Sequence, residues 1–316
     1  MQSMFRRGIW SWSMLAALGC GPSATAEPAA VAEAPLPASA VDDLGQTWVR
    51  IARDDGRQPL AMQTAIVRYV PADEFVEGQP GDDYPQYVDL VAAVHVGDPA
   101  YYAELNRRFR DYDAVLYELV APEGTVVPRG RGTSNAHALG AVQNAMKSML
   151  ELSHQLEEVD YTRRNFVHAD MSPEDFVQSM TDRKESFLEL YFRILGASMA
   201  HQSQTAASGE SPEAELMVAL LANDRARRLK VLLAKQFEGM ESLMLAFNGT
   251  DGTTIITERN NRALDVLRRE LDNGRRRTAV FYGAGHLGDM HQKLLDDFDL
   301  VPASITWLDA WDLRAQ

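Results

Sequence analysis

The sequence contains almost no cysteine: Cys20 is the only one among 316 residues. A disulfide within the chain requires two cysteines and a thiolate metal cluster requires several, so both are excluded. Any metal site formed by this chain must therefore use histidine, aspartate and glutamate side chains. Beyond its N-terminal region the sequence also lacks a run of about 20 apolar residues, the length that a transmembrane helix needs.

Positive charge is also in short supply. The chain has 31 lysines and arginines against 45 aspartates and glutamates, which gives a formal net charge of -14. Proteins that track a phosphate backbone need a basic stripe, so we expect no nucleic-acid partner. The hydrophobic fraction of 46% is that of an ordinary globular protein and is sufficient for a buried core.

The N-terminus explains the single cysteine. Arg6 and Arg7 precede an apolar run, residues 8–18, which is too short to span a bilayer. This run leads into Ala-Leu-Gly-Cys, which resembles a bacterial lipobox. We predict that residues 1–20 are a lipoprotein signal peptide and that Cys20 is lipidated. The protein would then be exported and anchored to a cell-envelope membrane, on the periplasmic or outer surface. A signal peptide cleaved without lipidation is the alternative.

The next segment is dominated by small residues and proline. Residues 21–44 are rich in alanine, proline, serine and glutamate, and this composition cannot form a core. We therefore predict a tether there, followed by one α/β domain over residues 45–316.

The first part of this domain has the pattern of a βαβ unit. Residues 87–96 form a strongly apolar run typical of a buried strand. Asp98 and Pro99 then favour the start of a helix to about Arg110, and residues 113–120 indicate another strand. Such a unit implies parallel strands joined by a right-handed crossover. Two further strands are predicted before it, over residues 47–53 and 60–70.

The remainder alternates between two patterns. Residues 135–247 indicate helix after helix, with a clear helix start at Ser172. The α/β pattern then resumes with helices at 257–273 and 287–298, strands at 277–282 and 303–308, and a tight turn at 283–286. The predicted fold is therefore α/β, with a mixed sheet built from two βαβ half-repeats and a large all-helical insertion.

The two βαβ units align with each other without a gap. Residues 95–98 (His-Val-Gly-Asp) match residues 286–289 (His-Leu-Gly-Asp), and Glu118 then matches Asp309, each 23 residues after its histidine. Ligands of open parallel sheets bind beyond the carboxyl ends of strands, so the repeat predicts two histidines and two acids at one edge. Asp309 would there orient an imidazole; a surface aspartate is the alternative.

These residue types suit a particular chemistry. His95, Glu118 and His286 offer imidazole and carboxylate ligands for a divalent ion with an open position for water, which becomes a nucleophile. Gly283 and Gly285 would allow the backbone to pass close to a ligand. A buried, hydrogen-bonded structural role is the alternative for either histidine alone, and the two matching contexts favour a site.

The same residues resemble the TraB/GumN family, which includes the TIKI and PrgY-related proteins. Residues 93–95 (Ala-Val-His) and the strand ending at Glu118 resemble its first half. The Glu-Arg-Asn of residues 258–260 and the Gly-Ala-Gly-His-Leu of residues 283–287 resemble its second half. The resemblance spans about residues 45–311.

The resemblance implies a site and a function. His95, Glu118 and His286 would be metal ligands or catalytic groups, and Arg259 a further site residue. Animal TIKI proteins are metal-dependent proteases at the membrane surface, and related folds include erythromycin-esterase-like and haem-binding ChaN-like proteins. The leading expectation is a hydrolase of peptides or small esters outside the cytoplasm, dependent on Mn, Co or Zn. Two alternatives are a lipoprotein that binds haem, metal or a peptide signal without turnover, and a metal-independent esterase with histidine as base.

The lipobox generates a first testable prediction. Cys20→Ser removes the only thiol that can carry a lipid, so the variant should be released from membranes while the wild-type protein stays bound. Fractionation of cells followed by detection of the protein checks this. Wild-type protein found in the cytoplasm with residues 1–19 still attached would show the prediction to be wrong.

Overall fold

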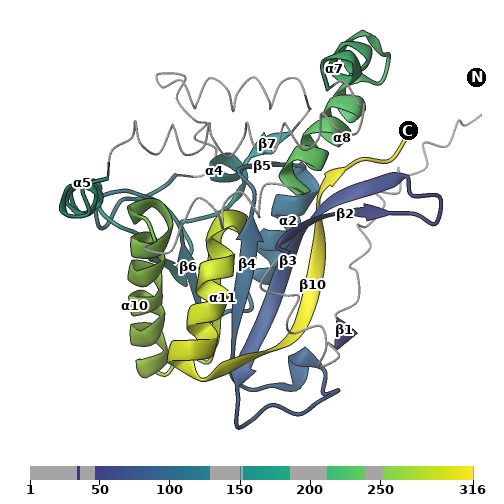
Figure 1. The fold of residues 1–316 in the computed structure, drawn as a ribbon. Helices are drawn as coiled ribbons and strands as arrows, with labels where there is room; N and C mark the ends of the chain where they lie inside the picture. The colour runs from purple at the N-terminus through teal and green to yellow at the C-terminus, as the bar shows by residue number, and fades with distance from the viewer. Residues whose placement is uncertain are drawn as a thin grey trace, which may run out of the picture.

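A mixed β-sheet covered by helices on both faces forms the core of the protein (Figure 1). The computed structural model describes residues 34–35, 47–128, 150, 152–185, 212–238 and 252–315. Within these residues the strand order of the main sheet is β1-β10-β3-β4-β9-β6-β8, with β2 paired to β3. The strands are β1 (Ala34–Pro35), β2 (Val49–Arg53), β3 (Pro59–Pro71), β4 (Tyr87–Ala93), β6 (Ala114–Tyr117), β8 (Phe166–His168), β9 (Arg277–Gly283) and β10 (Leu300–Asp312).

Helices and short elements complete the described chain. A small two-stranded sheet joins β5 (Val96–Gly97) to β7 (Ser153–His154). The α-helices are α2 (Pro99–Arg108), α4 (Gln155–Glu158), α5 (Pro173–Asp182), α7 (Pro212–Leu221), α8 (Arg225–Glu238), α10 (Arg259–Asp272) and α11 (Ala284–Phe298). A 3₁₀ turn, η2, covers Gly81–Asp83, and a π-helical turn, η3, covers Thr254–Glu258.

The centre of the sheet is parallel. β4 pairs with β9 over their full length, with Ala93 opposite Gly283. β6 pairs with β9 on its other side, and β8 pairs with β6, both in parallel. The carboxyl ends of these four strands therefore meet at one edge of the sheet. β3 and β10 extend the sheet through antiparallel pairs.

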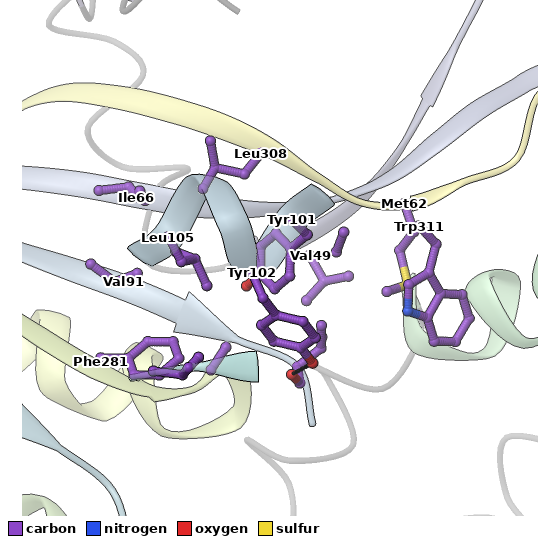
Figure 2. Close-up of a cluster of buried hydrophobic side chains, with 14 of the residues drawn as sticks. Val49, Met62, Ile66, Val91, Tyr101, Tyr102, Leu105, Phe281, Leu308 and Trp311 are labelled. Carbon is purple, nitrogen blue, oxygen red and sulfur yellow. Dashed lines mark hydrogen bonds between the residues drawn. The ribbon is translucent and has the colours of Figure 1, made fainter. Parts of the chain in front are cut away.

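Alternation along the central strands builds one core on each face of the sheet. Val91 and Phe281 face the side covered by α2, where they lie among Tyr102 and Leu105 (Figure 2). Their strand neighbours face the opposite side, where α10 and α11 lie side by side over the sheet (Figure 1). This second core comprises Val88, Leu90, Val280, Tyr282, Leu264, Leu267, Leu287, Met290 and Leu294.

Both predicted strand–helix–strand units are present, and the helix start at Ser172 is confirmed. The Ser172 hydroxyl accepts a hydrogen bond from the Asp175 N–H at 3.0 Å. The fold is therefore α/β with a mixed sheet of parallel and antiparallel strands, as the sequence indicates. No helix in the described ranges is long and apolar enough to cross a membrane.

Three segments differ from the sequence prediction. Residues 152–168, expected to be helical, contain β7 and β8, and β8 is part of the main sheet. β8 has only three residues, too few to show a strand period. In the predicted tether, Ala34 and Pro35 pair with Ile305 and Ser304 of β10. α11 begins at Ala284, inside the predicted tight turn. The predicted signal peptide with Cys20 lies outside the described residues, as do residues 129–149, 186–211 and 239–251.

A buried ion pair joins β3 to β4. Arg68 donates from Nε and Nη2 to the two carboxylate oxygens of Asp89, each at 2.9 Å, and the Tyr112 hydroxyl donates to the same carboxylate at 2.6 Å. The guanidinium also lies 3.8 Å above the ring of Tyr87. Although burial opposes its charge, the hydrogen bonds and charge of Asp89 raise the pKa of Arg68 above its ordinary value.

We expect Arg68→Met to lower the free energy of unfolding by about 3 kcal/mol, because it leaves the fully buried Asp89 without its counter-charge. Urea denaturation at neutral pH measures the loss. Asp82→Asn is the matched control: it removes the partner of Arg68 that is 81% exposed and should cost less than about 1 kcal/mol. Equal losses in the two variants would contradict the assignment of Asp89 as the partner that matters.

Candidate functional site at the carboxyl ends of four parallel strands

The four parallel strands each deliver one polar residue to the same edge of the sheet. Glu118 directly follows β6, and Asp170 lies two residues beyond β8. His95 lies two residues beyond β4, and His286 lies in the first turn of α11, directly after β9. Because Ala93 pairs with Gly283, the two histidines leave neighbouring strand ends. The edge is where ligands of open α/β sheets bind.

Glu118 is held at the N-terminus of α11. Its Oε2 accepts the Gly283 N–H at 2.7 Å, and its Oε1 accepts from Arg259 Nη2 at 2.7 Å. Burial would raise the pKa of Glu118, but His286, Arg259, His95 and the Gly283 N–H together lower it to about 2. The positive end of the helix also favours a carboxylate here. Glu118 is therefore an anion at neutral pH, able to accept a proton or bind a cation but not to act as a general acid.

The amide of Asn260 determines the tautomer of His286. Asn260 Nδ2 donates to the His286 carbonyl at 2.9 Å and to Asp289 Oδ2 at 2.8 Å, so its Oδ1 is the acceptor for His286 Nδ1 at 2.7 Å. Nδ1 therefore carries the proton and Nε2 has the lone pair. Burial lowers the pKa of His286, which the charge of Glu118 partly opposes. The imidazole is neutral at pH 7, with Nε2 3.6 Å from Glu118 Oε1.

Arg259 bridges the two buried carboxylates. Its Nε and Nη2 donate to Asp170 at 2.9 and 2.6 Å, and Nη2 also contacts Glu118. Its Nη1 lies 3.4 Å from His286 Nε2. Burial would lower the pKa of Arg259, but Asp170 and Glu118 raise it above its ordinary value. The π-helical turn η3 ends directly before Arg259, and such turns are frequent at functional sites.

His95 takes a different position from the other three predicted residues. Its side chain is exposed, whereas His286 and Arg259 are buried, and its charge contributes to the lowered pKa of Glu118. The surrounding backbone is fixed: the Tyr102 hydroxyl donates to the Val94 carbonyl at 2.9 Å, and the His95 carbonyl accepts the Gln155 N–H at 3.0 Å. His95 is thus a solvent-facing histidine on a well-held segment beside the buried group.

Asp309 does not join this group. The predicted repeat requires β10 to lie beside β4, but β3 takes that place and separates β10 from it. The Asp309 carboxylate accepts from Gln63 Nε2 at 2.7 Å and from Arg314 Nη2 at 3.2 Å. Glu118 and Asp309 each follow a histidine by 23 residues, but their side chains have different surroundings.

The two glycines singled out by sequence have different roles. A Cβ at Gly283 would lie 3.2 Å from Glu118 Oε2, so the backbone here passes close to the Glu118 carboxylate; a close approach to a ligand stays a prediction. Gly285 lies within the first turn of α11 and not in a loop. Two polar residues of the site were not predicted as site residues. Asn260 stands in the Glu-Arg-Asn motif that drew attention to Arg259, whereas Asp170 follows the short β8 and has no sequence signal.

The donors can be tested for their fit to a divalent ion. Two ligands about 2.1 Å from a tetrahedral ion lie roughly 3.4 Å apart, close to the 3.6 Å between Glu118 Oε1 and His286 Nε2. The hydrogen bond from Nδ1 to Asn260 is the support that a metal-binding histidine usually has. Within the described ranges, however, no three His, Cys, Asp or Glu side chains form a metal-binding group, and His95 would have to supply the third donor.

Comparison with known proteins identifies no relative of this chain. The chain matches no protein-family model, no curated protein and no solved structure.

The buried imidazole predicts a pH dependence of stability. An unfolded chain protonates His286 near its ordinary pKa of about 6.5, while the folded protein does so only at lower pH. As the pH falls below about 6.5 the unfolded state takes up the proton first, so the free energy of unfolding should decrease. His286→Asn should make this decrease shallower between pH 7 and 5, as measured by urea denaturation at each pH.

His291 provides a comparison on the same helix. Burial also lowers its pKa, and its Nδ1 contacts the Tyr69 hydroxyl at 2.6 Å. His291→Asn should therefore remove a separate part of the pH dependence, and the double variant should lose more than either single one. A slope identical to that of the wild type in His286→Asn would contradict the neutral, buried state of this imidazole.

Proposed function

We propose that the protein is a hydrolase of peptides or small esters in which His286 and Glu118 activate water. The observation that supports this is the geometry of a neutral imidazole whose Nε2 lone pair lies 3.6 Å from an ionised carboxylate. Nε2 can take a proton from a water molecule, and Glu118 would stabilise the imidazolium that results. Asn260 keeps the proton on Nδ1, and so Nε2 unprotonated, by accepting a hydrogen bond from Nδ1–H.

The proposal includes membership of the TraB/GumN family and the metal dependence that this resemblance implies. Glu118 and His286 would hold the ion together with His95. A bound Mn, Co or Zn ion would supply a water of lowered pKa near neutral pH. In this version Glu118 is a ligand, which agrees with its permanent negative charge, and Arg259 holds that carboxylate in place through its bond to Asp170.

One observation favours the metal-independent esterase as a second candidate. The guanidinium of Arg259 already contacts Glu118, and its Nη1 lies 3.4 Å from His286 Nε2. A permanent cation therefore stands beside the base, where it can stabilise negative charge that develops on a substrate oxygen. In this case His286 is the general base by itself.

We also propose that the protein acts outside the cytoplasm as a lipid-anchored member of the cell envelope, on the evidence of its N-terminal sequence. No contact among the described residues specifically favours a binding protein for haem, metal or a peptide signal, and the experiment below distinguishes it.

The test uses purified protein with Cys20→Ser. Metal content is measured first, followed by turnover of peptide and ester panels with and without chelator. Metal with chelator-sensitive turnover supports the metal-dependent hydrolase, and turnover that survives chelation supports the esterase. Capture of metal, haem or peptide without turnover would contradict hydrolysis.

Variants connect the activity to this site. Glu118→Gln and His286→Asn should each lower kcat/KM by about 10²- to 10⁴-fold, since each removes a group that acts on the reacting water. Glu123→Gln changes an exposed carboxylate nearby in sequence and should leave kcat/KM unchanged. Activity that persists in both site variants would place the reaction elsewhere.

A further inference from the structure

In the helical pair α7–α8, large apolar side chains of α7 are exposed to solvent instead of buried. α7 packs against α8, yet over residues 215–221, where the structure describes side-chain burial, the one buried residue is the small Ala219, 2% exposed. Its large apolar side chains face outward: Leu221 is 81% exposed, Val218 60% and Met217 57%. A helix that packed only against the described part of this domain would show the opposite arrangement. An exposed apolar surface of this kind marks a place of contact with another apolar phase or partner.

A cleft of about 640 Å³ lies beside this surface, between β2, the β2–β3 turn and the two helices. Its apolar lining includes Ile51, Val231 and Leu232. Its rim is basic, and the cations are Arg53, Arg57, Arg227, Arg228 and Lys235.

The rim keeps an excess of positive charge after its own ion pairs are counted. Asp224 pairs with both Arg227 and Arg228, and Glu215 lies 3.7 Å from Lys235. The β2–β3 turn also contains Asp54 and Asp55, which do not line the cleft. With Arg53 left out of the count, four cations stand against the two paired acids, Asp224 and Glu215. This is a local reversal in a chain of net charge -14, so the rim is complementary to an anionic surface.

The position of the pair indicates what that surface is. α7 stands beyond the edge of the sheet toward which β4 points, at the far end of α8 (Figure 1). Apolar side chains at a projecting end with cations beside them are the arrangement that inserts into the headgroup region of a membrane. We propose that α7 and the basic rim dock the protein on an anionic phospholipid surface, with the apolar side chains of α7 in the interface and the rim cations against the headgroups.

The single cysteine allows a direct test. In the full-length chain with Cys20→Ser, Leu221→Cys introduces the only thiol, which can carry an environment-sensitive dye. Val177→Cys on α5, where Val177 is 62% exposed, is the matched control. Vesicles of phosphatidylcholine with phosphatidylglycerol should shift the dye at position 221 to an apolar spectrum, with at least about tenfold weaker binding to phosphatidylcholine alone. The dye at position 177 should not shift.

Charge variants test the rim. The double variant Arg57→Glu with Arg228→Glu should weaken the vesicle binding reported by the dye at position 221 by at least about tenfold. Arg57→Glu alone should weaken it by a smaller factor. Arg107→Glu with Arg110→Glu makes the same charge change on exposed residues of and after α2 and should have little effect. The N-terminus is the same in every variant, so it cannot produce these differences.

Other results would overturn the proposal. One is no dye shift at position 221, and another is an equal shift at positions 221 and 177. A third is an equal loss of vesicle binding in the rim double variant and in Arg107→Glu with Arg110→Glu. A shift that depends on protein concentration without vesicles would indicate a second copy of the chain instead. A shift with monomeric laurate but not with vesicles would indicate a pocket for a single amphiphilic anion.

Discussion

The parallel pairing of β4, β9 and β6 is the constraint on which the site depends. Through this register Ala93 lies opposite Gly283, and the Glu118 N–H reaches the Phe281 carbonyl at 3.3 Å. Side chains that are far apart in sequence therefore leave the sheet at one edge. The buried tyrosines of α2 reinforce the arrangement, because Tyr101 and Tyr102 donate hydrogen bonds to the backbone at the end of β4 and just beyond it.

Charge is distributed at this edge so that each group has a partner. Arg259 compensates both Asp170 and Glu118, which would otherwise be buried anions at high cost. His286 stays neutral because it is buried, and Asn260 fixes its tautomer by accepting a hydrogen bond from Nδ1–H. The outcome is one strongly held carboxylate and one uncharged imidazole, two groups with clearly different acid–base properties in contact with each other.

Much of this arrangement was accessible from the sequence. Apolar strand runs and helix starts predicted β4, α2, β6, β9 and α11, and the rule that ligands bind at carboxyl ends of parallel strands predicted that Glu118 and His286 converge. Both predictions rest on local patterns, which a single sequence contains. The predicted signal peptide, most of the predicted tether and much of the helical insertion fall on residues outside those described.

The remaining features depend on long-range pairing, which local patterns do not contain. Asp309 was placed by aligning the two βαβ units, but β3 lies between β10 and β4 and pairs antiparallel with both. Asp170 follows β8, a strand of three residues that forms by pairing with β6. Gly283 to His286 suggested a turn because glycine is a weak helix former, yet α11 starts at Ala284, with Glu118 bound to the N–H of its N-cap residue Gly283.

The pairing of Ala34 and Pro35 with β10 limits how far the domain can lie from a lipid attached to Cys20. With a lipid on Cys20, as proposed, only 14 residue steps separate the membrane anchor from this first fixed point. Fully extended, they reach no more than about 50 Å. Ala34 could then lie no farther than this from the bilayer, and the rest of the domain extends from that point. Encounters would be restricted to molecules embedded in the same membrane, lying on it, or diffusing within the combined reach of this segment and the domain.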